Sequence, residues 1–154
     1  ATLTMIGNFE FGAEINVRKL VDQFELHERI KFLGRIPKNA MADHFSQHDL
    51  FLYQTINDGS PRIVLEAMSS GIPIIASRHP GIDILDPNGS VISFTAFGDS
   101  RRVADLVADY SQNAAPWIER AQCGRERVIA NFSTATIAAR YSDFYRALVE
   151  STIL

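Results

Sequence analysis

The stretch of residues 58–81 constrains the fold most, because it encodes a loop, a short helix and a buried strand in direct succession. Ser60 is predicted to cap the helix through its hydroxyl, with Pro61 at the first helical position, where proline is tolerated. Gly71 is typical of a helix C-terminus. The apolar, β-branched run that begins at Ile72 is typical of a strand covered on both faces. The pattern therefore predicts part of an α/β domain.

The start of this helix suits a ligand that carries both negative charge and hydroxyl groups. Free backbone N–H groups at a helix N-terminus favour an anion such as a diphosphate. Asp58 and Glu66 bracket the helix start, and carboxylates accept hydrogen bonds from hydroxyls, which a sugar or a ribose supplies in pairs. A nucleotide-sugar satisfies both features. The structural alternative is that Arg62 and Glu66 form a solvated ion pair and that residues 58–61 are only a turn.

Short apolar strands alternate with helical patterns along the first two thirds of the chain. Strands are predicted at residues 3–6, 30–33, 49–54, 72–77 and 91–94, helices at 14–26 and 39–47, a loop and helix at 58–70, one helical turn at 81–86, and helices throughout from residue 99. This alternation predicts an α/β fold of Rossmann-like type, a three-layer parallel sheet with helices on both faces, formed by a single domain over residues 1–154. Strand 49–54 is almost wholly apolar, so we expect it to be central.

Ligands of such sheets bind at the carboxyl ends of the strands, near a topological switch point. The loops after the second, third and fourth strands are therefore the candidates for a binding site. The loop that contains Asp58 follows the third strand, as this rule requires.

The composition argues against several other classes of protein. The net charge of −3, without a basic cluster, gives no general attraction to nucleic acid. No apolar run approaches the roughly 20 residues that a membrane-spanning helix needs. A single cysteine, Cys123, leaves no internal disulfide and fits a reducing cytoplasm.

Two weaker signals involve histidines. His44 and His48 are four residues apart on a predicted helix, a spacing that can bind a metal, but no third ligand accompanies them and we expect no metal site. His79 precedes Pro80 and Gly81 near the predicted ligand site, although an ordinary loop histidine is the simpler interpretation.

The run from Asp58 through Glu66-Ala-Met to Gly71-Ile-Pro73 resembles the donor-binding motif of retaining glycosyltransferases of family 4 (group 1), which have the GT-B fold. That pattern places an acidic residue eight positions before the Glu of Glu-Ala-Met, and this chain keeps the spacing. The first acid is Asp where the family more often has Glu, which shortens the side chain by one methylene. The likeness extends from Leu3 to about Tyr145.

The resemblance implies roles for both acids. As the carboxylates of the catalytic site, Asp58 would bind hydroxyls of the donor sugar and Glu66 would hold the hydroxyls of the ribose. The backbone of the residues between them would hold the sugar and the diphosphate: Gly59, Ser60, Pro61, Arg62, Ile63 and Val64.

Two more segments resemble parts of the family's donor site. The run 30–34 resembles the strand before the pocket for the nucleotide base, so Gly34 and backbone groups near Arg35 and Ile36 would contact the base. The run 49–55 resembles a strand that usually ends in Pro-Ser. Thr55 keeps the hydroxyl there, which would allow a phosphate contact.

The resemblance implies an enzyme that transfers a hexose from a nucleotide-diphosphate sugar to a glycan or lipid-linked acceptor, with retention of anomeric configuration and without a metal or other cofactor. In the family, a preceding strand carries an Arg and a Lys that neutralise the diphosphate, and a separate N-terminal domain binds the acceptor. We therefore expect this chain to be the N-terminally truncated C-terminal domain of a two-domain enzyme, inactive alone. We expect the intact enzyme in the cytoplasm, with peripheral association to the inner membrane in the synthesis of surface polysaccharides.

Two other functions remain open at this point. A nucleotide-sugar epimerase uses the same fold, and a non-catalytic nucleotide-binding module would need only part of the site.

Overall fold

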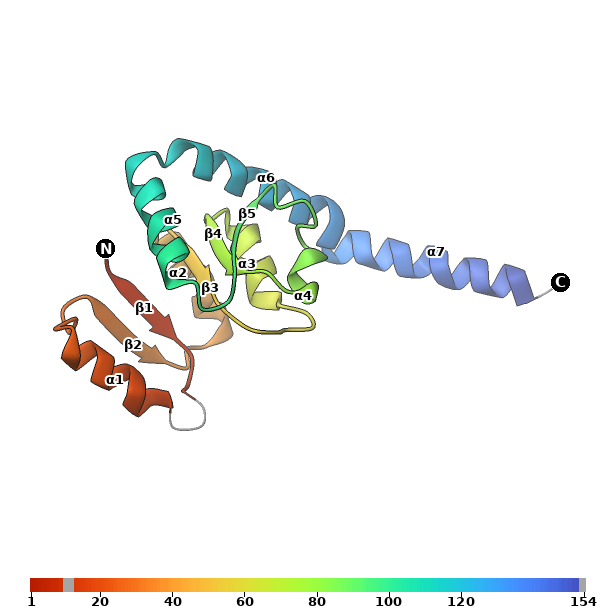
Figure 1. The fold of residues 1–154 in the computed structure, drawn as a ribbon. Helices are drawn as coiled ribbons and strands as arrows, with labels where there is room; N and C mark the ends of the chain where they lie inside the picture. The colour runs from red at the N-terminus through yellow and green to blue at the C-terminus, as the bar shows by residue number, and fades with distance from the viewer. Residues whose placement is uncertain (10–12, 153–154) are drawn as a thin grey trace. The chain divides into compact units, whose positions relative to one another are not determined.

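The computed structural model describes residues 1–9 and 13–152, which divide between Met41 and Ala42 into two compact units (Figure 1). The first unit contains β1 (Leu3–Ile6), α1 (Ala13–Gln23), β2 (Ile30–Gly34) and a 3-10 turn (Lys38–Ala40). α2 (Met41–Ser46) follows at the boundary. The second unit continues with β3 (Phe51–Tyr53), α3 (Arg62–Ser70), β4 (Ile74–Ser77), α4 (Pro80–Asp83), β5 (Ile92–Thr95), α5 (Ser100–Gln112), α6 (Ala115–Phe132) and α7 (Thr134–Thr152).

The first unit is a β-α-β arrangement. β1 and β2 pair in parallel, with Leu3 opposite Ile30. The N–H of Gly7, just beyond β1, donates to the carbonyl of Gly34, the last residue of β2, over 2.8 Å. Helix α1 buries Val21, and the guanidinium of Arg18 lies 4.9 Å from the centre of the Phe32 ring. This is the parallel pairing that the sequence pattern predicted.

The sheet of the second unit has the strand order β3-β4-β5, with both pairs parallel. All four residues of β4 are buried, because its side chains point alternately into two covered faces. Ile75 packs with Leu106 of α5 and Trp117 of α6. The fold is thus α/β and Rossmann-like with helices on both faces, as predicted. β3 is an edge strand of this sheet, so its predicted central position is wrong. β4 is the central strand, and its residues are the more completely buried because it has a neighbouring strand on each side.

Helix α3 closely follows the sequence pattern. Val64, Ala67 and Met68 are buried along one face, whereas Arg62 and Ser70 are exposed. The helix ends at Gly71, whose φ of 72° lies in the left-handed region that glycine adopts without strain.

The C-terminal third is helical, as predicted. The carboxylate of Asp99 accepts a hydrogen bond from the N–H of Arg102 and caps α5. The hydroxyl of Ser133 accepts one from the N–H of Thr136 over 3.2 Å and caps α7. No helix among the described residues is long and apolar enough to cross a membrane.

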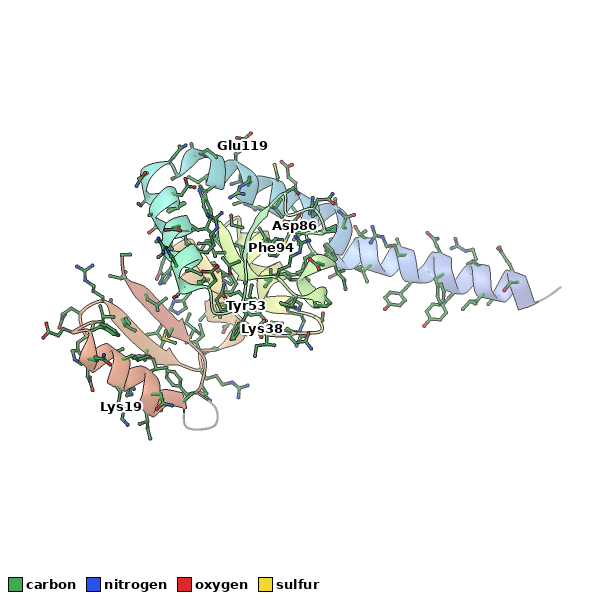
Figure 2. All side chains as sticks on the ribbon, in the orientation of Figure 1. Lys19, Lys38, Tyr53, Asp86, Phe94 and Glu119 are labelled. Atoms are coloured by element: carbon green, nitrogen blue, oxygen red, sulfur yellow. The ribbon has the colours of Figure 1, made fainter. Side chains whose placement is uncertain are left out.

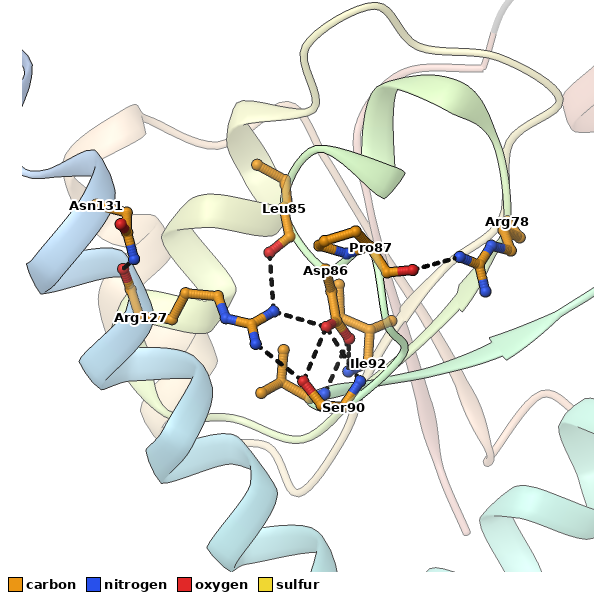
Figure 3. A network of polar contacts seen from close by, with 9 residues as sticks. Arg78, Leu85, Asp86, Pro87, Ser90, Ile92, Arg127 and Asn131 are labelled. Carbon is orange, nitrogen blue, oxygen red and sulfur yellow. Dashed lines mark hydrogen bonds and ion pairs between the residues drawn. The ribbon is translucent and has the colours of Figure 1, made fainter.

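A buried carboxylate fixes the turn between α4 and β5 (Figure 3). The Asp86 side chain is fully buried and accepts hydrogen bonds from the N–H groups of Ser90, Val91 and Ile92 at 2.8–3.0 Å. Nη1 of Arg127, from α6, donates to the same carboxylate over 2.7 Å. Asp86 therefore joins the start of β5 to helix α6.

These contacts govern the protonation of Asp86. Burial opposes its ionisation, but the N–H groups of Ile92, Val91 and Ser90 and the guanidinium of Arg127 outweigh that effect and hold the pKa of the carboxyl below its ordinary value of 3.8. Because the pKa is lower in the folded state, Asp86 contributes its full stabilisation above the ordinary value. That contribution is lost as the pH falls through the depressed folded-state pKa.

We predict that Asp86→Asn lowers the free energy of unfolding by about 3 kcal/mol, because it leaves the partly buried guanidinium of Arg127 without its fully buried counter-charge. Urea unfolding at neutral pH measures the loss, and the difference between variant and wild type should narrow in acid. Asp143→Asn is the matched control. It removes the same charge from an exposed ion pair with Arg146 and should change stability by less than about 0.5 kcal/mol. Equal losses in the two variants would contradict the role given to Asp86.

Candidate donor-binding site

The loop after β3 is tied to the end of β4 by one buried hydroxyl. The N–H of Thr55 donates to Oγ of Ser77 over 2.8 Å, and the same hydroxyl donates to the carbonyl of Thr55 over 2.6 Å. Ser77 is fully buried and is the last residue of β4. The hydroxyl of Thr55, predicted to contact phosphate, donates to the carbonyl of Asn57 over 3.2 Å. The loop therefore starts from a fixed point at the carboxyl ends of β3 and β4.

Asp58 is held through both of its carboxylate oxygens. The hydroxyl of Tyr53, at the end of β3 and labelled in Figure 2, donates to Oδ2 over 2.6 Å. The N–H of Ser60 donates to Oδ1 over 2.9 Å. The predicted sugar-binding acid is thus also the residue that shapes its own loop.

The two partners shift each other's ionisation. The hydroxyl of Tyr53 and then the N–H of Ser60 lower the pKa of Asp58. Burial opposes this shift, and the charge of His79 adds the smallest contribution to the lowering. Burial, followed by the hydrogen bond to Asp58 and its negative charge, raises the pKa of Tyr53 far above its ordinary range. Asp58 is therefore an anionic acceptor at neutral pH, and Tyr53 is a neutral donor.

The start of α3 differs from the prediction. Pro61 occupies the cap position, Arg62 is the first helical residue, and the Ser60 side chain makes no capping bond. The reason is local: the N–H of Arg62 donates to the Ser60 carbonyl over 2.8 Å, while the N–H of Ser60 is directed to Asp58. The predicted Ser60 hydroxyl cap is therefore wrong.

Several backbone N–H groups at the start of α3, which were predicted to be free for a ligand, donate hydrogen bonds within the chain. Besides Ser60 and Arg62, Val64 uses its N–H, which donates to the Pro61 carbonyl over 2.9 Å. Pro61 has no N–H. Within residues 59–64 this leaves Gly59 and Ile63 as the two N–H groups without an acceptor among the described residues.

Glu66 lies in the second turn of α3 and is half-buried. Its neighbours Val64, Ala67 and Met68 are in the core, so the carboxylate belongs to the opposite side of the helix. The backbone carbonyl of Glu66 accepts a hydrogen bond from the Ser70 hydroxyl over 2.9 Å.

The residues predicted to contact the base lie in the first unit. Gly34 ends β2 with a φ of 64°, a left-handed conformation, and its carbonyl accepts the N–H of Gly7. Arg35 and Ile36 follow directly, so all three residues occupy the carboxyl end of β2, as predicted.

Gly81 packs against the backbone of the Asp58 loop, although it was not among the predicted site residues. A Cβ on Gly81 would lie 1.8 Å from the carbonyl oxygen of Asp58 and 3.2 Å from the carbonyl carbon of Gly59, so only glycine lets the two backbones approach this closely. In the sequence, the glycine of the His79-Pro80-Gly81 run is the one feature that could have indicated this close approach of two backbones.

His79 is buried beside this loop. Its exposed fraction is 4%, and its ring centre lies 6.4 Å from that of Tyr53. Neither ring nitrogen has a hydrogen-bond partner among the described residues. His79 is therefore a buried residue beside Tyr53, and whether it borders a bound donor stays a prediction.

A pocket of about 680 Å³ elsewhere in the second unit contains none of the predicted site residues. Its lining comes from β5, α5, α6 and two adjoining loops: Arg78, Asn88, Gly89, Ile92, Ser93, Phe94, Arg102, Leu106, Asp109, Pro116, Trp117 and Arg120. Arg120 donates to Ser93 over 2.8 Å and lies over the Trp117 ring. Charged side chains of this kind commonly protect an edge strand such as β5, and we assign no ligand to the pocket.

His44 lies on α2, whereas His48 lies two residues beyond the end of this helix. Nδ1 of His48 lies 2.7 Å from the carbonyl oxygen of His44. Among residues 1–9 and 13–152, no group of three or more His, Cys, Asp or Glu side chains is placed to hold a metal ion.

We predict that Gly81→Ala lowers the free energy of unfolding by about 2 kcal/mol or more, because the added methyl must push the Asp58 backbone away. Thermal unfolding measures the effect. Gly59→Ala is the matched control, since a Cβ there meets nothing within 4 Å and φ is not in the left-handed region. An unchanged melting temperature for Gly81→Ala would show that the loop is not packed on Gly81.

Comparison with known proteins gives a consistent assignment. The family model described as glycosyl transferases group 1 matches residues 1–139. The chain is 26% identical over 146 residues to the N-acetyl-alpha-D-glucosaminyl L-malate synthase of Bacillus anthracis, covering 94% of this chain and 37% of that protein. It is 24% identical over 136 residues to the amylovoran biosynthesis glycosyltransferase AmsK of Erwinia amylovora, covering 84% and 33%.

Among solved structures, the fold matches Anabaena Alr3699/HepE in complex with UDP and glucose. The TM-score is 0.82 at 21% identity, over 94% of this chain and 40% of that one. The chain thus spans about a third to two fifths of the length of these three proteins. The family model covers nearly all of it, and on that basis the chain belongs to the group 1 glycosyl transferases.

Proposed function

We propose that this chain is the donor-binding part of a retaining glycosyltransferase that moves a hexose from a nucleotide-diphosphate sugar to a glycan or lipid-linked acceptor. The observation that carries the proposal is the loop and helix from Asp58 to Glu66. Tyr53 and Ser77 anchor them at the carboxyl ends of β3 and β4, where α/β sheets bind their ligands. Membership in the group 1 family supports transferase chemistry.

The roles of the two acids follow from their surroundings. Asp58 is an ionised, half-exposed acceptor at the mouth of the loop, suited to hydroxyls of the donor sugar. Glu66, in the second turn of α3, is placed to accept from a hydroxyl pair such as that of a ribose. Gly59 and Ile63 offer N–H groups to phosphate oxygens, and the partial positive charge of the helix start adds to their attraction.

The relatives support the nature of the donor. The structure of Anabaena Alr3699/HepE contains UDP and glucose, and another structure of that protein contains UDP-glucose. The AmsK relative is named for the biosynthesis of the polysaccharide amylovoran. We propose a nucleotide-sugar donor and a role in polysaccharide or glycolipid synthesis, in the cytoplasm at the inner face of the membrane.

The rest of the enzyme is also a proposal. The chain spans about a third of the AmsK length, and we propose that a preceding strand with cationic side chains and an N-terminal acceptor domain complete the active site. The chain alone would then bind donor weakly and would not turn over. We propose metal-independent chemistry, in which cations and helix amides stabilise the leaving diphosphate.

We predict that one of UDP, GDP and ADP raises the melting temperature of the full-length protein, and that its hexose conjugate raises it further. A ligand at a hundred times its Kd adds about 2.7 kcal/mol of stability. Glu66→Ala should reduce the shift with nucleotide, and Asp58→Ala should remove only the added gain from the sugar. Glu119→Ala, an exposed glutamate on α6, is the control and should leave both shifts unchanged.

The possible results of this titration separate the alternatives. A nucleotide shift without a sugar gain indicates a non-catalytic nucleotide-binding module. No shift with any ligand in the full-length protein would overturn the proposal.

We also predict that the glycosidic product keeps the anomeric configuration of the donor and that EDTA leaves the rate unchanged. The coupling constant of the anomeric proton in an NMR spectrum of the product reports the configuration. Inversion, or a rate abolished by EDTA and restored by Mg²⁺ or Mn²⁺, would contradict the mechanism. Conversion of the nucleotide-sugar without an acceptor would indicate an epimerase instead.

A further inference from the structure

Tyr53 makes the shorter of the two hydrogen bonds to Asp58. It is a half-buried residue at the end of β3, and its hydroxyl reaches Oδ2 of Asp58 over 2.6 Å. Hydrogen bonds to an ionised acceptor are shorter and roughly twice as strong as those between neutral groups. The contact therefore constrains the rotation of the Asp58 side chain.

The backbone beneath this carboxylate is constrained as well. Gly81 packs directly against the Asp58 carbonyl, and the hydroxyl of Ser77 holds the start of the loop at Thr55. With the main chain held on two sides, the direction of the carboxylate depends on its own two donors. Among the described residues these are the Tyr53 hydroxyl and the Ser60 N–H.

The two donors leave part of the carboxylate unused. Two oxygens provide about four acceptor sites, and Tyr53 and Ser60 occupy one on each oxygen. Asp58 is half-exposed, so the other sites are accessible to a ligand. Tyr53 thereby determines which direction the remaining acceptor sites face.

We infer that Tyr53 is a positioning residue for the donor sugar: it orients the Asp58 carboxylate so that its remaining acceptor sites face hydroxyl groups of the sugar. The inference rests on the proposed function. It makes Tyr53 a determinant of the affinity for the sugar part of the donor, while the nucleotide part is held elsewhere. Asp58 is one methylene shorter than the Glu that the family more often has at this position. The hydrogen bond from Tyr53 fixes the direction of this shorter side chain.

The test is Tyr53→Phe in the full-length protein, a change that removes one oxygen and keeps the aromatic ring. We expect the Kd for the nucleotide-sugar to rise about tenfold, the loss of one hydrogen bond to a charged group. The Kd for the bare nucleotide should stay within about twofold. Isothermal titration with both ligands measures the two constants.

Tyr110→Phe is the matched control. Tyr110 packs against the ring of Trp117 in the core cluster of Ile75 and Leu106. Removal of its hydroxyl oxygen should leave both dissociation constants unchanged. A separate readout needs no ligand: ¹³C NMR of the Asp58 carboxyl should give a higher pKa in Tyr53→Phe than in wild type, because the largest cause of its lowering is gone.

The outcomes distinguish this inference from the proposed function. If wild type gains affinity from the sugar and Tyr53→Phe keeps that gain, Tyr53 does not position the donor and only the inference fails. Equal weakening for nucleotide and nucleotide-sugar would make Tyr53 a purely structural residue and would also overturn it. If wild type binds neither ligand, the proposed function itself fails.

Discussion

The complete burial of β4 is the constraint on which the second unit depends. Four consecutive residues without access to water require cover on both faces of the strand and a partner strand on each edge. β3 and β5 supply the edges, while α5 and the start of α6 cover the Ile75 side. Because β4 is fixed in this way, the residues at its carboxyl end form a rigid support for whatever is built there.

The candidate site uses that support twice. Ser77 closes β4 and holds the loop at Thr55, and Gly81 lies under the backbone of Asp58. Each contact joins residues more than twenty positions apart in the chain. A loop with this anchoring can hold an ionised side chain in one orientation without a bound ligand, which is the preorganisation that a binding site for hydroxyl groups needs.

Asp86 lies before the start of β5. Its buried carboxylate stabilises the turn there by accepting hydrogen bonds from backbone amides and pairing with Arg127 of α6. It resembles Asp58 in that an acid accepts from local N–H groups. The difference is exposure: Asp86 is fully buried, so its acceptor sites serve the fold, whereas Asp58 is half-exposed and can accept from a ligand. Burial thus separates a structural aspartate from a candidate binding residue.

The sequence by itself determined the elements and their order, because periodicity and glycine positions are local properties. The buried face of α3, its end at Gly71 and the parallel α/β class all follow from spacing. The eight-residue interval between Asp58 and Glu66 pointed to the candidate site for a different reason, its resemblance to the donor-binding motif of the family.

Only the tertiary structure decided how the site is held together. Ser60 looked like a helix cap, yet its N–H serves Asp58 and its hydroxyl makes no cap. Tyr53 looked like one more residue of an apolar strand, and β3 looked central until β4 proved to be the more buried strand. Contacts between segments distant in the chain, such as Gly81 with Asp58, have no local pattern. They arise from the close approach of two backbones, and no spacing along one segment encodes that approach.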